Sequence, residues 1–83
     1  MITVKVLGSG CAKCKVLHQR LLDLRTEHGL AFDLLKVTEL REIMSYGIMT
    51  TPGLVVNEVV KSAGALPDDG QILQWLEEAQ HAA

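Results

Sequence analysis

The strongest constraint on the fold is a switch of hydrophobic period within the first 37 residues of the 83-residue chain. Residues 2–7 alternate and are rich in β-branched side chains, which predicts a strand. Apolar residues then recur every three or four positions across 11–28, which predicts a helix that stops at Gly29. Residues 30–37 are short and apolar and predict a second strand. A strand, a long helix and a strand form a unit in which the two strands are parallel and the crossover is right-handed.

The second half of the chain predicts shorter elements. Thr38 is expected to cap a short helix over residues 39–46, with its buried side formed by three apolar residues, Leu40, Ile43 and Met44. Apolar runs at 54–56 and 59–63 flank Asn57 and Glu58 and predict a β-hairpin.

The last predicted element is an amphipathic helix. Asp68 and Gln71 have the spacing of a capping box, and an apolar stripe follows them, formed by Ile72, Leu73, Leu76 and Ala79. The element order is therefore β-α-β-α-β-β-α. We predict an α/β fold in which helices cover both faces of a four-stranded mixed sheet, with residues 1–83 forming one domain.

Composition argues against two classes of protein. The net charge is −2, whereas nucleic-acid binders usually carry a basic excess, so no nucleic-acid partner is expected. No apolar run approaches the roughly 18–20 residues of a membrane span, and the N-terminus lacks the layout of a signal peptide. We therefore expect a cytoplasmic protein without a membrane partner.

The chemically informative feature is a pair of cysteines, Cys11 and Cys14, at the start of the first predicted helix. Gly8, Ser9 and Gly10 break the strand, and Ser9 or Gly10 is expected to be the helix N-cap. A thiolate at a helix N-terminus is stabilised by unpaired backbone N–H groups and by the helix dipole. In a reducing compartment such a pair serves either redox chemistry or metal binding.

Charged residues and a proline accompany the pair. Lys13 and Lys15 add positive charge near Cys11 and favour its thiolate. Cys14, one turn further along the helix, is expected to be less exposed and to reach the first sulfur. Thr51-Pro52 lies just before the hairpin, and a cis proline there would turn the chain beside the cysteines. Only about 5–6% of X-Pro bonds in folded proteins are cis.

These motifs resemble the thioredoxin superfamily, and most of all the minimal thioredoxin- and glutaredoxin-like proteins called redox-active disulfide protein 2. The likeness covers nearly the whole chain, and its anchors are residues 10–14 and 47–52. It implies a thioredoxin-like three-layer α/β/α fold, with Cys11 as nucleophile, Cys14 as resolving thiol and Pro52 in cis. The first strand departs from thioredoxins because it carries Lys5 and no acid.

The resemblance implies a small dithiol–disulfide oxidoreductase that exchanges with protein disulfides and uses no cofactor and no metal. Thr51 and Pro52 would bind the substrate, while Gly10, Lys13 and Lys15 would support the site. An unidentified reductase or dithiol donor would be the second partner.

The alternative is a metallochaperone or other protein that binds a soft metal, such as Cu(I), zinc or arsenic, through the same dithiol. The segment 4–14 also resembles the Gly-Met-x-Cys-x-x-Cys loop of heavy-metal-associated copper chaperones, whose fold runs βαββαβ. Its main candidate for a third ligand is His18, which we interpret instead as a partly exposed surface histidine. Met44 and Met49 are expected in the core rather than on a metal.

Overall fold

A computed structural model describes residues 2–8 and 10–81 of the chain. Its elements are β1 (Ile2–Leu7), α1 (Ala12–Glu27), β2 (Phe32–Val37), α2 (Leu40–Ser45), β3 (Gly53–Val56), β4 (Val59–Ala63) and α3 (Asp69–His81). The order β-α-β-α-β-β-α and the fold class agree with the prediction from the sequence.

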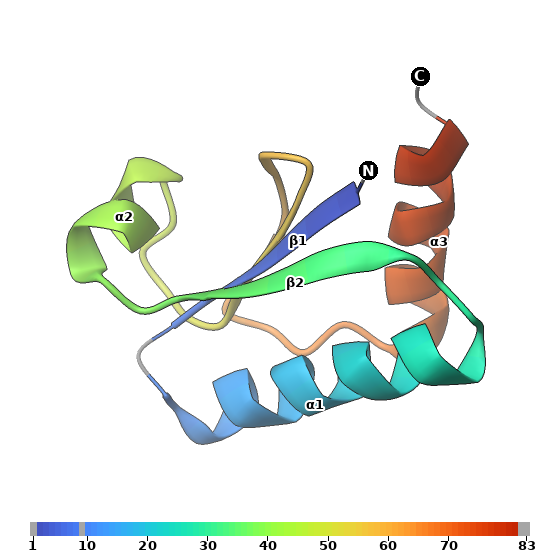
Figure 1. Cartoon of the computed structure of the whole chain (residues 1–83). Coiled ribbons are helices and arrows are strands. Elements are labelled where there is room, and N and C mark those ends of the chain that lie inside the picture. Colours follow the sequence, from blue (N-terminus) through green and yellow to red (C-terminus); the bar gives the residue numbers. More distant parts are fainter. Residues whose placement is uncertain (1, 9, 82–83) are drawn as a thin grey trace.

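The sheet has the strand order β2-β1-β3-β4 and is mixed (Figure 1). β1 and β2 are parallel along their whole length, from Ile2 opposite Phe32 to Leu7 opposite Val37. β3 is antiparallel to both β1 and β4. The carboxyl end of β1 leads into the start of α1, where the two cysteines lie.

Two cores form on the two faces of the sheet. α1 and α3 cover one face and bury the larger core, which consists of Val4, Val6, Leu17, Leu21, Leu24, Phe32, Leu54, Val56, Ile72 and Leu76. The smaller core contains Leu7, Val37, Ile43, Ile48 and Val55, and α2 contributes Ile43 to it. Figure 1 shows α1 and α2 on opposite sides of the sheet, which gives the predicted three layers.

The prediction for α2 was wrong in two respects. Leu40 and Met44 are 68% and 62% exposed, and only Ile43 faces the core. The helix has six residues, fewer than two turns, so it places one side chain rather than a full stripe on the sheet. Its N-cap is Glu39, without a side-chain hydrogen bond, and not Thr38.

Met49 was also predicted wrongly. It was expected in the core, but its side chain is 98% exposed. It follows Ile48, which takes the buried place in this segment. Together with Leu40 and Met44 it leaves apolar side chains on the surface around α2.

The start of α3 is fixed as the sequence predicted. Asp68 Oδ1 accepts a hydrogen bond from the Gln71 N–H at 2.8 Å. Arg20 of α1 donates to the Pro67 carbonyl oxygen at 3.2 Å and pairs with Asp69 at 3.3 Å, so α1 and α3 are joined there. Trp75 packs against the larger core. Among the residues described, no helix has both the length and the apolar character needed to span a bilayer.

Candidate active site

The two cysteines lie where β1 passes into α1. Cys11 itself is the N-cap of α1, and its Sγ accepts a hydrogen bond from the Cys14 N–H at 3.2 Å. The sequence predicted Ser9 or Gly10 at this position. Gly10 is not the cap, and Ser9 lies outside the described residues. A sulfur performs here the function that a hydroxyl or carboxylate oxygen usually performs at a helix start.

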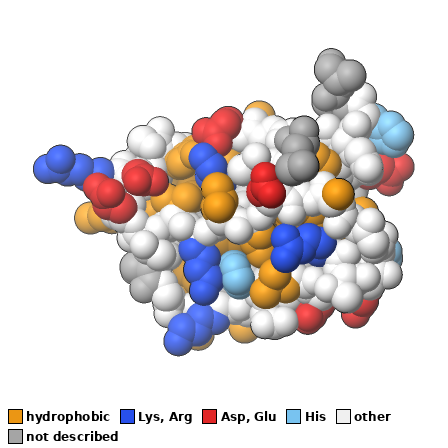
Figure 2. Space-filling view, viewed as in Figure 1, with side chains coloured by type: hydrophobic (Ala, Val, Ile, Leu, Met, Phe, Trp, Pro, Cys, Tyr) orange, Lys and Arg blue, Asp and Glu red, His pale blue; other side chains and the backbone are white. Residues whose placement is uncertain are grey.

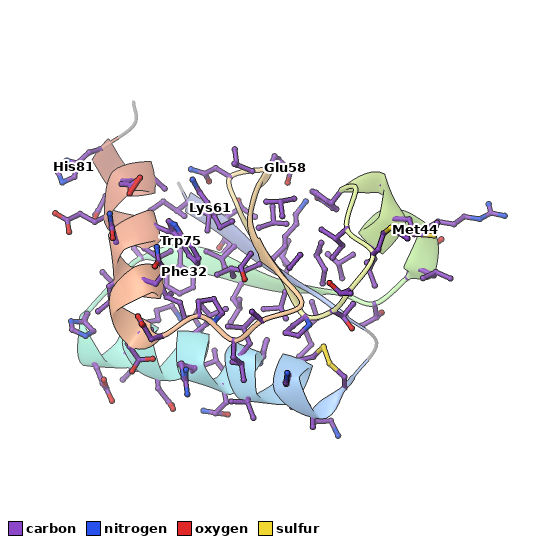
Figure 3. All side chains as sticks on the ribbon, turned by 180° about the vertical axis from the view of Figure 1, so that it is seen from behind. Phe32, Met44, Glu58, Lys61, Trp75 and His81 are labelled. Atoms are coloured by element: carbon purple, nitrogen blue, oxygen red, sulfur yellow. A yellow bond between two sulfur atoms is a disulfide. The ribbon has the colours of Figure 1, made fainter. Side chains whose placement is uncertain are left out.

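Cys11 and Cys14 form a disulfide, with their Cα atoms 5.0 Å apart. Figure 3 shows this bond in yellow at the start of α1. Cys14 is only 5% exposed, whereas Cys11 is partly exposed. Of the two cysteines, Cys11 at the helix start is therefore the more accessible to another molecule.

The loop that contains Thr51 and Pro52, just before β3, lies beside this pair. The surroundings of Gly8 show how closely the loop and the disulfide approach each other. A Cβ placed on Gly8 would overlap Cys14 Sγ and would lie 3.6 Å from Thr51 Cβ. The end of β1 is thus packed between the disulfide and the loop before β3. The Gly8 N–H donates to the Val37 carbonyl at 2.9 Å, which continues the β1–β2 pairing up to the cysteine loop.

The Thr51–Pro52 peptide bond is cis. Pro52 is buried and its carbonyl oxygen accepts a hydrogen bond from the Gly64 N–H at 2.8 Å, while the Thr51 side chain is exposed. The loop is therefore anchored from the β4 side and turns Thr51 toward solvent next to the cysteines.

The remaining predicted site residues surround the first turn of α1. Lys13 and Lys15 are exposed, so their charges lie in solvent near the dithiol. Gly10 has a φ of +90°, a left-handed conformation that favours glycine. In the reduced protein, the Cys14 N–H and the helix N-terminus favour the thiolate form of Cys11.

Two hollows flank the site, and the sequence predicted neither of them. The first has a volume of about 190 Å³ and is lined by Val6, Gly8, Gly10, Cys14, Lys15, His18, Lys36 and Thr38. The second has a volume of about 470 Å³ and is lined by Thr38, Leu40, Ile43, Met44, Ile48, Met49 and Thr51. Both depend on contacts between elements distant in the chain, which periodicity does not report.

Lys5 is the only charged residue of β1, the strand that carries no acid. Its Nζ donates to Tyr46 Oη at 2.8 Å and to Glu58 Oε1 at 2.6 Å. These hydrogen bonds, first that to Glu58 and then that to Tyr46, raise the pKa of Lys5. Glu58 accepts hydrogen bonds from Lys5 and, through Oε2 at 3.0 Å, from Tyr46 Oη, and these two bonds, in that order, lower the pKa of Glu58. The lysine thus joins β1 to α2 and the hairpin turn.

The metal alternative gains no support from the structure. Within residues 2–8 and 10–81, no group of three or more His, Cys, Asp and Glu side chains is arranged to hold an ion. The chain also ends in α3, whereas the copper-chaperone fold that its cysteine loop resembles ends in a strand.

A dithiol at a helix start, packed beside a cis-proline loop on a four-stranded mixed sheet, defines the thioredoxin-like class of proteins. The family model described as "Thioredoxin domain" matches residues 2–77, and the chain belongs to this family.

Two curated relatives are each named thioredoxin. That of Methanocaldococcus jannaschii is 28% identical over 76 residues, which cover 92% of this chain and 87% of the relative. That of Methanothermobacter thermautotrophicus is 28% identical over 76 residues, covering 92% of this chain and 99% of the relative.

Solved structures show the same fold. A chain titled "Structure of a malarial protein" superposes with a TM-score of 0.68 at 14% identity, covering 100% of this chain and 99% of that one. Oxidised thioredoxin from Plasmodium falciparum superposes with a TM-score of 0.63 at 17% identity, covering 93% of this chain and 79% of that one. The family and the Cys11–Cys14 disulfide together indicate a thiol–disulfide oxidoreductase.

Proposed function

We propose that the protein is a dithiol–disulfide oxidoreductase that acts on protein disulfides, with Cys11 as the nucleophile and Cys14 as the resolving thiol. One observation supports this assignment most directly. The partly exposed Cys11 caps a helix through its sulfur, and it is bonded to the buried Cys14 one turn away. An incoming disulfide meets the first sulfur, and the second is held in place to complete the exchange.

The proposed reaction has two steps. The Cys11 thiolate attacks one sulfur of the substrate disulfide, so a mixed disulfide forms and the other substrate sulfur leaves as a thiolate. The Cys14 thiolate then attacks Cys11 Sγ, and the second substrate sulfur leaves. Both substrate sulfurs take up protons, the substrate gains two electrons, and the protein dithiol becomes the observed disulfide.

The surface around Thr51 suits a protein substrate. The hollow of about 470 Å³ next to Thr51 is lined by Leu40, Met44 and Met49, whose side chains are largely exposed. Methionines adapt to different apolar side chains, which favours the binding of varied protein segments. Thr51 and Pro52 would hold such a segment beside Cys11.

The supporting residues and the setting of the reaction complete the proposal. Gly10 gives the loop its left-handed turn, and Lys13 and Lys15 favour the Cys11 thiolate. An unidentified reductase or dithiol donor regenerates the reduced protein. We place the activity in the cytoplasm, because a reducing compartment keeps an exchange dithiol available to its substrates.

The test is to trap the mixed disulfide. Cys14→Ser should accumulate a covalent adduct with insulin, a protein that contains disulfides, and dithiothreitol should release it. Cys11→Ser is the matched control and should form no comparable adduct, because Cys14 is buried. Adducts of equal yield in both variants would refute the assigned roles, and no insulin reduction by the wild type with dithiothreitol would refute the function.

A further inference from the structure

His18 lies one helical turn beyond Cys14 on α1. Residues four apart on a helix face the same side, with their Cβ atoms about 5–6 Å apart. Both side chains line the same hollow of about 190 Å³, between α1 and the ends of β1 and β2. Figure 2 shows several Lys and Arg side chains on the face where β2 lies over α1.

The lining of this hollow leaves one proton acceptor near the buried cysteine. Among the residues that the structure describes, the titratable side chains of this lining other than Cys14 are Lys15, His18 and Lys36, with no carboxylate. A lysine ammonium group has three donors and no acceptor, so neither lysine offers a lone pair to a proton. The imidazole is the group that is able to do so.

The surroundings of His18 keep it neutral. Burial, followed by the charges of Lys36 on β2 and Arg25 on α1, holds the pKa of His18 below its ordinary value. An unprotonated imidazole at neutral pH is the form that accepts a proton. The positive charges of Lys15 and Lys36, which line the same hollow, favour the Cys14 thiolate once its proton has left.

The first strand, β1, carries no side chain that could take the Cys14 proton in place of His18. Lys5 is paired with Glu58 and hydrogen-bonded to Tyr46, and neither of these side chains lines the hollow. The Cys14 thiol, which is 5% exposed, has little contact with bulk water that could take its proton.

We propose that His18 is the general base that receives the Cys14 proton when the mixed disulfide is resolved, a role that rests on the proposed function. The transfer crosses the hollow, whose volume has room for several water molecules at about 30 Å³ each. The Cys14 thiolate then forms a bond to Cys11 Sγ, and the bond from Cys11 to the substrate breaks. The leaving thiolate takes up a proton from solvent, and the imidazolium returns its proton to solvent.

Ellman's reagent separates the two steps in one experiment. When the fully reduced protein reacts with this small aromatic disulfide, the attack by Cys11 releases one coloured thiolate, and resolution by Cys14 releases a second. His18→Gln should slow the second release by about tenfold and leave the first unchanged. This effect is below the hundredfold typical of general bases because a thiol is already a moderately strong acid.

The pH dependence gives a readout that loss of structure does not mimic. The wild-type rate of the second release should rise through an inflection below pH 6.5, the ordinary pKa of histidine, and His18→Gln should lack this inflection. His28→Gln is the matched control, because His28 is an exposed histidine at the other end of α1, and it should behave as the wild type.

Lys36→Gln tests the same idea without removing the imidazole. Loss of this charge should move the inflection to higher pH, because Lys36 is one of the causes that lower the pKa of His18. An unchanged second release in His18→Gln, or an inflection that stays in place in Lys36→Gln, would overturn the role of His18. Failure of the wild type to release the second thiolate would instead refute the proposed function.

Discussion

Gly8→Ala is the sharpest test of how the active site is packed. The added methyl would overlap Cys14 Sγ, a sulfur that is held by its bond to Cys11 and cannot rotate away. Cys14 is also buried, so neither solvent nor a mobile side chain can absorb the displacement. The end of β1 or the start of α1 must shift.

An extra methyl group in a closely packed interior lowers the free energy of unfolding by about 1–3 kcal/mol, and we expect a loss of this size for the oxidised form of Gly8→Ala. A protein of 83 residues has a total stability of about 4–12 kcal/mol, so the loss is a large fraction of it. A loss of 2 kcal/mol lowers the melting temperature of a domain of this size by about 8–16 °C.

The cost should depend on the redox state. In the reduced protein the Cys14 side chain is free to rotate away from the new methyl, so the dithiol form loses less stability than the disulfide form. A difference of about 1.4 kcal/mol between the two forms would raise the reduction potential by about 30 mV. Gly8→Ala should therefore be a stronger oxidant than the wild type.

The assay is thermal unfolding of oxidised and reduced samples, together with redox titration against glutathione. Gly70→Ala is the control, because its added Cβ would meet nothing closer than Asp68 Oδ1 at 3.5 Å. That change should be neutral or slightly stabilising. Equal melting temperatures for Gly8→Ala and the wild type in the oxidised form would show that β1 does not pack against Cys14 as described.

Three further changes test other parts of the molecule. Asp68→Ala should cost about 1 kcal/mol by removing the N-terminal hydrogen bond of α3, and thermal unfolding measures this loss. The pKa of Glu58 is lowered in the folded protein, so its pairing with Lys5 contributes to stability at pH values above the unfolded pKa of about 4.5. This contribution is lost as the pH falls through the folded pKa of Glu58. Urea unfolding from pH 7 to pH 3 should show the gap between wild type and Glu58→Gln closing, and a constant gap would contradict this. Met49→Ser should lower kcat/KM for insulin reduction without changing the reaction with Ellman's reagent. The reason is that only a protein substrate extends over the hollow of about 470 Å³ that Met49 lines. Equal effects on both substrates would contradict this.

The parts of the fold that follow from local patterns could be predicted from the sequence. The period change between β1 and α1 and the parallel β1–β2 pairing depend on residues close in the chain. The hairpin was predicted although Asn-Glu is a weak turn sequence. Asn57 and Glu58 both take positive φ values, 49° and 67°, and the Glu58 side chain is tied to Lys5.

Other features depend on contacts between distant residues, and the sequence did not reveal them. Leu40, Ile43 and Met44 have the spacing of a buried stripe, but α2 is too short to lay more than Ile43 on the sheet. The neighbourhood of His18 depends on which face of α1 meets Lys36 of β2. The helical period identifies which side of α1 faces the sheet, but it does not identify the charged side chains of the sheet that lie opposite.

The position of the chain ends has a practical consequence. The start of β1 and the end of α3 both lie on the side of the molecule opposite the loop between β1 and α1 (Figure 1). The hairpin turn is held to the start of β1 there, through hydrogen bonds between Thr3 and Asn57 of 2.8 and 2.9 Å. A resin or a fusion partner attached at either end would leave the dithiol approachable, so immobilised Cys14→Ser protein is suited to capturing substrates from a mixture.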